Sequence, residues 1–352
     1  MADQDWSDSQ IREMVRGLES LRRGDFASAA LIGCGPRAIE PLRRYLLQGK
    51  PRGIFQPRQL AVETLAALGA RDVLLEYLRQ SRLIVDPVVR FSEANVQSTA
   101  ARALSHWLSD DVYRELKDLA DTHLLLPGLV EALAEFRRLE MVPYFLWALG
   151  DGECREAGEE ALRKIGVVAR PLLAEAATAP APSRDEETPS SRIRRRKVLG
   201  ILADGQVSDA EWRALRPLLD DRDTEIAAIT ARIALQVGTT PDQTKAAKQL
   251  IEILPRADWF LRTYVRSCLA DHYDVARPQI ESEIATRNAA GEKERALDMV
   301  LRLLVNLKTQ VEKAEQIGAG LCQNREQSTL RRLRRPVPRW VAIICRFVNT
   351  ND

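Results

Sequence analysis

Aromatic side chains are scarce in this sequence: Phe, Trp and Tyr together make up 5% of its 352 residues. Alanine, leucine, arginine and glutamate are abundant instead, and this balance favours helices over sheet. An excess of charge of one sign is also missing, because the formal net charge is only +2. Any attraction to nucleic acid must therefore come from local clusters of charge. With 45% hydrophobic and 29% charged residues, the composition is that of a folded protein.

Long apolar runs and paired cysteines are lacking too. No apolar run approaches the roughly 20 residues that a membrane span needs. The first residues, MADQDWSDSQIREMV, are acidic and do not contain the apolar core of a secretory signal. The five cysteines are scattered, odd in number and without a C-x-x-C spacing, which is typical of free thiols in a reducing compartment. We therefore expect a cytoplasmic protein without a transmembrane segment.

Catalytic motifs are absent as well. The sequence contains no G-x-S-x-G, no P-loop and no Rossmann glycine pattern, and no Ser or Cys has an evident base beside it. Its three histidines, His106, His123 and His272, lie far apart in the sequence. The segment DHYD, residues 271–274, could ligate a metal, but a turn at a helix end explains it better. We expect a protein that is not an enzyme, with no catalytic residues, no metal and no cofactor.

A recurring pattern of helix, tight turn and helix is present instead. In ALIGCGPRAIEPLRRYLL, Gly33 and Gly35 suit a helix end and Pro36 suits the start of the next helix. The same pattern recurs along the chain, and the first helix of each pair is predicted to end near residues 33, 69, 106, 136, 166, 203, 237, 270 and 306. This spacing is typical of helical-pair repeats, which bury their apolar faces by stacking on their neighbours. The alternative is a single globular helical bundle with coincidental spacing.

Two of these segments, DDRDTEIAAITARIALQVG and GDGECREAGEEALRKIG, resemble HEAT repeats, together with GPRAIEPLRRYL and VVARPLLAEA. They are most similar to the short HEAT-like repeats of the phycobilin lyase type. The resemblance spans roughly residues 20–310 and implies an all-α fold, a right-handed α-solenoid of about nine HEAT-like repeats. The third and fourth units depart from the pattern because they lack a clean glycine turn. HEAT-repeat families include scaffolds, a few enzymes and nucleic-acid binders. Neither a bilin pocket nor the His-Glu pairs of the deoxyhypusine hydroxylases can be found here.

Composition divides the chain into four parts. Residues 1–178 form a first arm of repeats, and residues 179–191 form a Pro- and Ser-rich flexible loop. Residues 192–310 form a second arm, and residues 311–352 form a basic cap or tail. The tail joins arginines to the apolar run WVAIICRFV, so it could cover the end of the solenoid or contact a membrane surface or nucleic acid.

Two clusters of basic residues could contact phosphate or an acidic partner. The first is RIRRRK, which could equally be the solvated start of a helix. The second lies in the tail. Their members are Arg192, Arg194, Arg195, Arg196 and Lys197, and Arg331, Arg332, Arg334 and Arg335.

The second helices of the pairs offer a third candidate surface, expected to line the concave face. Its cations could follow a phosphate backbone, as in the alkylpurine DNA glycosylases, which are also built from HEAT-like repeats. The acidic residues interleaved with these cations would repel DNA; they are Glu40, Glu76, Glu115 and Asp118. Its two aromatic residues, Tyr144 and Trp147, are typical anchors for a protein partner, although some of VPYFLWALG must be core. The candidate residues of this surface are Arg43, Arg44, Arg79, Arg114, Lys117, Tyr144 and Trp147. The sequence thus favours a non-catalytic scaffold or adaptor that binds another protein on its concave face, with nucleic-acid binding as the alternative.

Overall fold

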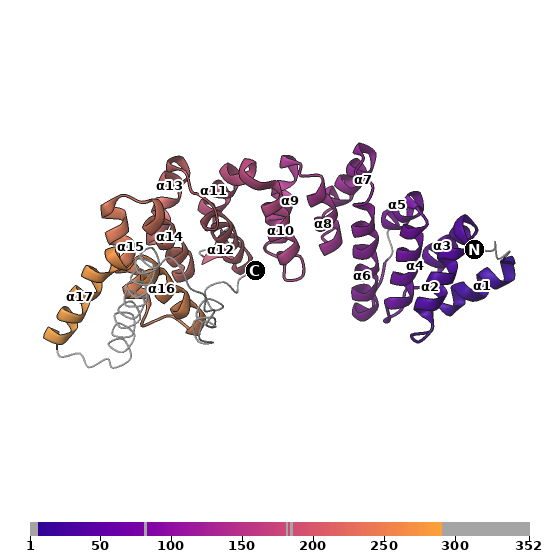
Figure 1. Ribbon diagram of the computed structural model, residues 1–352, viewed down its shortest axis with the longest axis horizontal. Helices are drawn as coiled ribbons and strands as arrows, with labels where there is room; N and C mark the ends of the chain where they lie inside the picture. The colour runs from indigo at the N-terminus through magenta and orange to yellow at the C-terminus, as the bar shows by residue number, and fades with distance from the viewer. Residues whose placement is uncertain (1–5, 81–82, 181, 184–185, 291–352) are drawn as a thin grey trace, which may run out of the picture. The chain divides into compact units, whose positions relative to one another are not determined.

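The fold was analysed in a computed structural model, which describes residues 6–80, 83–180, 182–183 and 186–290. Apart from one pair of two-residue strands, this part of the chain is all-α (Figure 1). The chain divides into two compact units, Met1–Val265 and Arg266–Asp352. The boundary falls within helix α16, and helix α17 belongs to the second unit.

The described helices can be assigned to successive pairs in chain order. The first helices of the pairs are α2 (Gly24–Gly33), α4 (Gln56–Ala67), α6 (Pro87–Leu104), α8 (Pro127–Glu135), α10 (Arg155–Ile165), α12 (Pro189–Ala203), α14 (Thr224–Val237) and α16 (Trp259–Asp271). The second helices are α3 (Ile39–Gln48), α5 (Arg71–Arg79), α7 (Asp110–Asp121), α9 (Val142–Ala148), α11 (Arg170–Thr178), α13 (Asp209–Leu215), α15 (Thr240–Ile253) and α17 (Tyr273–Ala290). Helix α1 (Asp8–Gly17) precedes them. The helix predicted to end near residue 306 lies outside the described residues.

Within Met1–Val265 the first helices contact one another in succession. Helix α2 packs on α1 and α4, α4 on α6, α6 on α8, α8 on α10, α10 on α12, and α12 on α14. The second helices also meet, α3 with α5, α5 with α7, and α11 with α13. Each helix therefore buries one side on its own pair and another on the next pair, and the core runs through the unit as a continuous layer of mostly Leu, Ile, Val and Ala.

Local sequence explains where the helices begin and end. Proline occupies the first turn of α4, α6, α8, α9, α11, α12 and α15, where its missing N–H costs nothing. Gly35, Gly69 and Gly166 turn the chain with φ near +64°, +73° and +76°, values that favour glycine. In the fourth pair, where the sequence lacks that glycine, Arg137 takes φ of 51° at the end of α8.

In the part of the chain that the structure describes, four short 3₁₀ segments connect the helices of a pair or extend them. They are η1 (Gly35–Ala38), η2 (Leu139–Met141), η3 (Gly166–Ala169) and η4 (Arg216–Asp220). The segment predicted as a flexible loop contains the strands β1 (Pro182–Ser183) and β2 (Glu186–Glu187), which pair antiparallel with Pro182 opposite Glu187. Its last residues, Pro189–Ser191, already belong to α12, and α11 and α12 pack directly on each other.

Candidate partner-binding surface

The predicted cations of α3 and α5 are held by carboxylates rather than aligned as a free positive stripe. Arg43 on α3 donates from Nη2 to Oε1 of Glu76 on α5 at 2.5 Å. Arg79 forms the equivalent pair with Glu115 of the next second helix, α7. Arg44 pairs with Glu40 one turn earlier on its own helix, at 2.8 Å. Three of the interleaved acidic residues, Glu40, Glu76 and Glu115, are therefore the ionic partners of these arginines.

The cations of α7 make contacts within that helix. Arg114 donates from Nε to the backbone oxygen of Asp110 at 3.1 Å, and Lys117 donates from Nζ to Asp121 at 2.9 Å. Contacts of this kind within one exposed helix stabilise it only weakly. Arg114 is exposed and Lys117 is half-buried, so both cations lie at the surface.

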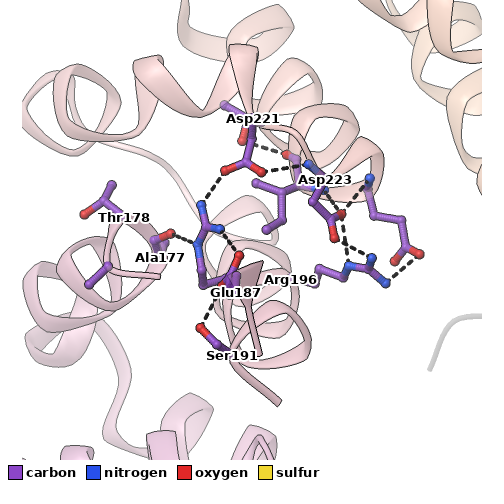
Figure 2. A network of polar contacts seen from close by, with 12 residues as sticks. Ala177, Thr178, Glu187, Ser191, Arg196, Asp221 and Asp223 are labelled. Atoms are coloured by element: carbon purple, nitrogen blue, oxygen red, sulfur yellow. Dashed lines mark hydrogen bonds and ion pairs between the residues drawn. The ribbon is translucent and has the colours of Figure 1, made fainter. Parts of the chain in front are cut away.

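The cluster RIRRRK on α12 does not form a surface patch, because its central arginine is buried. Arg195 is 3% exposed and lies between the end of α11 and the loop before α14. Its Nε donates to the backbone oxygen of Ala177 at 2.7 Å, which satisfies a carbonyl that the end of α11 leaves without a helical partner. Its other nitrogens pair with Glu187 at 2.8 Å and with Asp221 at 2.5 Å. Figure 2 shows Ala177, Glu187 and Asp221 arranged around this site. The hypothesis of a surface contact is wrong for Arg195.

Its neighbours on α12 are also engaged. Arg196 pairs with Asp223 at 2.5 Å and with Glu225 at 2.7 Å, and Lys197 pairs with Glu159 of α10 at 2.8 Å. Arg194 donates to the backbone oxygen of Ala179 at 3.0 Å. Arg192 is half-buried at the rim of an open cavity of about 660 Å³. The second basic cluster, Arg331, Arg332, Arg334 and Arg335, lies outside the described residues.

Asp223 anchors this network and caps the following helix. Its Oδ1 accepts hydrogen bonds from the backbone N–H of Glu225 and of Ile226 at the start of α14. Burial raises the pKa of the Asp223 carboxyl, but the hydrogen bonds from Arg196 and from these N–H groups lower it by more, so the net pKa lies below the ordinary value. The carboxylate is therefore a structural anion that joins α12 to α14 (Figure 2).

A second buried arginine, Arg58 on α4, joins three helical pairs in the same way. It is 4% exposed and forms a two-pronged pair with Glu93 of α6, with Nε···Oε2 of 3.0 Å and Nη2···Oε1 of 2.9 Å. It also donates to the backbone oxygen of Leu46, at the end of α3, at 3.0 Å. Tyr77 of α5 completes the group by donating its hydroxyl to Glu93 at 2.8 Å. Burial raises the pKa of Tyr77, so it remains a neutral donor.

The two aromatic candidates on α9 behave differently. Tyr144 is buried, and its hydroxyl donates to the backbone oxygen of Leu124 at 2.8 Å. This contact ties α9 to the loop between α7 and α8, so Tyr144 is a core residue and not an anchor for a partner. Trp147 is 43% exposed, and its ring lies edge-on to those of His123 and Tyr144 at centroid distances of 6.0 Å. Of this aromatic pair, Trp147 alone is open to a partner.

Sequence reasoning missed a cluster of exposed apolar side chains in the N-terminal part of the chain. We call it the apolar edge, and its members are Leu21, Ile54, Phe55, Val88 and Phe91. They come from the loop between α1 and α2, the loop before α4, and the first turns of α6. The exposed fractions of Ile54, Val88 and Phe91 are 58%, 62% and 53%. The sequence signal was present in the apolar runs GIF and LIVDPVVRF, but such runs are ordinarily read as core.

Several contacts bring these residues together. Ser92, beside Phe91, donates its hydroxyl to the backbone oxygen of Gly53 at 2.7 Å. A Cβ atom added at Gly53 would lie 3.3 Å from Cγ1 of Val88, so the loop carrying Ile54 lies against the start of α6. Leu21 and Ile54 line one cavity, and α4 packs on α6.

The cavity beside the apolar edge has a volume of about 520 Å³. Its apolar walls include Leu21, Ile54 and Pro57, and Lys50 and Arg52 lie on its polar side. Arg52 pairs with Glu19 at 3.5 Å, which leaves Lys50 as an exposed cation. A pocket of this size accepts one bulky side chain of a partner.

The described residues offer no evident catalytic or metal centre. No group of three or more His, Cys, Asp or Glu side chains among them is placed to hold a metal ion. Burial raises the pKa of the Cys154 thiol to about 12, so this thiol is not an activated nucleophile. None of the described helices combines the length and apolarity required to cross a bilayer.

Comparison with known proteins gives no relative from which a function could be transferred. The chain matches no model of a known protein family, and no curated protein shows significant sequence similarity to it. The structure shows an all-α protein in its described residues, and its function must be argued from its own surface.

Proposed function

We propose that the chain is an α-solenoid of HEAT-like repeats and acts as a non-catalytic scaffold or adaptor for another protein. The fold part of this proposal is supported by the alternation of first and second helices and by the contacts of each first helix with the next. A protein of this design recognises its partner by shape and by burial of apolar surface over an extended area, and it requires no catalytic site.

The observation that carries the proposal is the apolar edge. Exposed Ile, Val and Phe side chains are common singly, but soluble proteins rarely leave several of them contiguous without a use. Here Ile54, Phe55, Val88 and Phe91 come from neighbouring elements, and Ile54 lines a cavity with room for an anchoring side chain. A partner that covered this edge would bury two phenylalanines, which are effective anchors in protein interfaces.

The alternative, nucleic-acid binding, has no comparable support. A phosphate track requires cations that are free to replace counterions. Arg43, Arg79 and Arg196 instead have carboxylate partners at hydrogen-bond distance on neighbouring pairs. We retain nucleic-acid binding only as an outcome that the experiment must be able to detect.

The test is affinity capture with the immobilised full-length chain in an extract of its source cells, followed by quantitative mass spectrometry. The variant Ile54→Asp with Phe91→Glu places two charges on the apolar edge. A true partner is expected to be captured by the wild type and depleted about tenfold or more by this variant, which corresponds to a loss of about 1.4 kcal/mol or more in binding. Purified candidate and chain are then mixed to show direct binding.

The matched control is Val167→Asp, a change at a side chain that is 79% exposed and lies far from the edge in sequence, on η3. It is expected to capture the same proteins as the wild type. The proposal is overturned if no captured protein depends on the edge. It is also overturned if duplex or single-stranded nucleic acid binds with affinity that falls steeply as salt rises.

A further inference from the structure

The outer side of the first two helices carries a second apolar surface. Helix α1 and helix α2 form an open groove of about 640 Å³, lined by Trp6, Met14, Phe26 and Ala30, with Glu13 and Arg23 among its polar walls. We call it the terminal groove. Among the described helices, α2 packs on α1 and, on its other side, on α4. Within the described part of the chain, no helix covers the groove.

Phe26 stands out from this surface. Its side chain is 80% exposed although it lies within helix α2, where a residue turned inward would be covered by a neighbour. A phenylalanine left in water forgoes the favourable free energy of burial. Phe26 itself lines the groove, and the other walls of this hollow include Trp6 and Met14. A projecting ring and a hollow that receives one therefore lie side by side on the same face.

The charges at the groove are also complementary to each other. Glu13 on α1 pairs with Arg16 of its own helix at 3.5 Å, and both side chains are more than three-quarters exposed, so this pair contributes little. Arg23, at the start of α2, is exposed, and no carboxylate of the described residues is paired with it. One face thus offers a carboxylate and a guanidinium that are both available to a partner.

We propose that the chain forms a two-fold symmetric homodimer through the terminal groove. A two-fold axis places the same surface on both subunits, so each projection meets the partner's hollow. Phe26 of one subunit enters the groove of the other, and Glu13 faces the partner's Arg23 on both sides of the axis. The occupant is a second copy because the projecting ring, the hollow and both charge signs are found together on this one face. This inference does not depend on the proposed scaffold function.

The first test measures the mass of the full-length chain in solution, by light scattering and by sedimentation, from about 1 to about 100 µM. The expected mass is twice the 39.6 kDa of one chain. Phe26→Glu places a charge in the apolar centre of each interface and is expected to give the single-chain mass throughout this range. Because Phe26 is exposed, the variant should retain the wild-type helical content and melting temperature, which circular dichroism checks.

The control is Phe91→Glu, the same change at an exposed phenylalanine of the apolar edge, which should leave the dimer intact. Phe26→Glu should in turn leave capture of an edge-dependent partner unchanged. The two proposals can therefore fail separately. A wild-type chain that is monomeric at all these concentrations, or a dimer that Phe26→Glu does not weaken, would overturn the homodimer.

A charge exchange tests the symmetric geometry. Glu13→Arg and Arg23→Glu, each alone, place like charges opposite each other and should raise the dissociation constant of the dimer about tenfold or more. The double variant restores opposite charges and should return to within about threefold of the wild type. If the double variant is as weak as the two single changes combined, Glu13 and Arg23 do not face each other and the arrangement proposed here is wrong.

Discussion

Two buried arginines perform the same task at different joints of the chain. Arg58 and Arg195 both satisfy a backbone carbonyl at the end of a second helix. Arg58 also binds Glu93 of the next pair, and Arg195 binds Asp221 in the loop before α14. A buried guanidinium has five N–H donors in one plane, so one side chain can fix three elements at once. Since an isolated charge in this position is very unfavourable, each partner is required by the others.

Replacing Arg58 with methionine should therefore be costly. The change leaves Glu93 buried with only the Tyr77 hydroxyl as a donor among the contacts described, and we expect a loss of about 3–5 kcal/mol in the free energy of unfolding. The double variant Arg58→Met with Glu93→Met should recover most of it, although Leu46 loses a donor. Urea unfolding followed by circular dichroism measures both.

The control for this prediction is Arg44→Met, which removes an exposed cation from a pair within one helix. We expect it to change the free energy by less than about 0.5 kcal/mol. Equal effects of Arg58→Met and Arg44→Met would contradict the assigned role of the buried group.

Asp223 gives a prediction of pH dependence. Its folded-state pKa lies below that of an aspartate in an unfolded chain, about 3.9, so the folded state binds the proton less tightly. The stability that it contributes is present above about pH 4 and is lost as the pH falls through the folded-state pKa. Asp223→Asn should be less stable at neutral pH and should show a shallower decline in unfolding free energy between about pH 5 and pH 2.

Urea unfolding at a series of pH values measures this decline. Asp118→Asn, at an exposed carboxylate of α7, is the matched control and should follow the wild type closely. Parallel pH profiles for wild type and Asp223→Asn would show that the carboxylate does not couple α12 to α14.

At the scale of the helices, one glycine sets how closely two first helices approach. Gly128, in the first turn of α8, donates its N–H to the Ser98 hydroxyl of α6 at 2.6 Å. A Cβ at this position would lie 1.8 Å from the backbone oxygen of Ser98, closer than any real contact. The packing of α6 on α8 therefore depends on the absence of a side chain here.

We expect Gly128→Ala to force the two helices apart and to lower the free energy of unfolding by about 1–3 kcal/mol. Gly200→Ala provides the contrast, because Gly200 lies inside α12 and a Cβ there meets nothing within 4 Å. There the better helix propensity of alanine should add about 0.5–1 kcal/mol. Thermal unfolding of the two variants distinguishes them, and a shift of the same sign in both would contradict this account.

The ends of the first helices are the part of the structure that the sequence predicts well. The ends predicted near residues 33, 166, 203 and 237 agree with the observed ends at Gly33, Ile165, Ala203 and Val237. They agree because glycine, proline and capping residues act locally. The pairing of Arg43 with Glu76 could not be predicted, since their distance in space depends on how successive pairs pack.

The sequence also could not predict which side chains of a short helix are buried. Helix α9 has seven residues, and VPYFLWA is apolar almost all round, so its period cannot decide which ring is covered. Tyr144 is buried by its contact with the preceding loop, and Trp147 is not. The apolar edge was missed for a related reason, because composition alone does not distinguish Val88 from a core valine.

At the scale of the whole unit Met1–Val265, contacts pass from each first helix to the next. In the α-solenoid proposed above, stability is approximately a sum of the energies within pairs and between neighbouring pairs, so damage to one pair should weaken its neighbours before distant ones. This differs from a single globular bundle, in which loss of one core residue weakens every element at once.

Phe145→Ala tests this distinction. Phe145 is fully buried in α9, and its loss should cost about 3–5 kcal/mol locally. Hydrogen exchange measured by mass spectrometry should show faster exchange in α8, α9 and α10, while α2 and α4 keep their protection. A uniform loss of protection across the unit would contradict stability that is set joint by joint.

The ion pairs that cross the joints have a consequence for how the molecule could be rearranged. Arg43 with Glu76, Arg170 with Glu211, and Arg196 with Asp223 each join one pair to the next, and each joint uses its own positions and charges. A pair cut out and grafted elsewhere would meet a neighbour without the matching charge. The pairs are alike in form but not interchangeable, and their order is encoded at the surfaces where they meet.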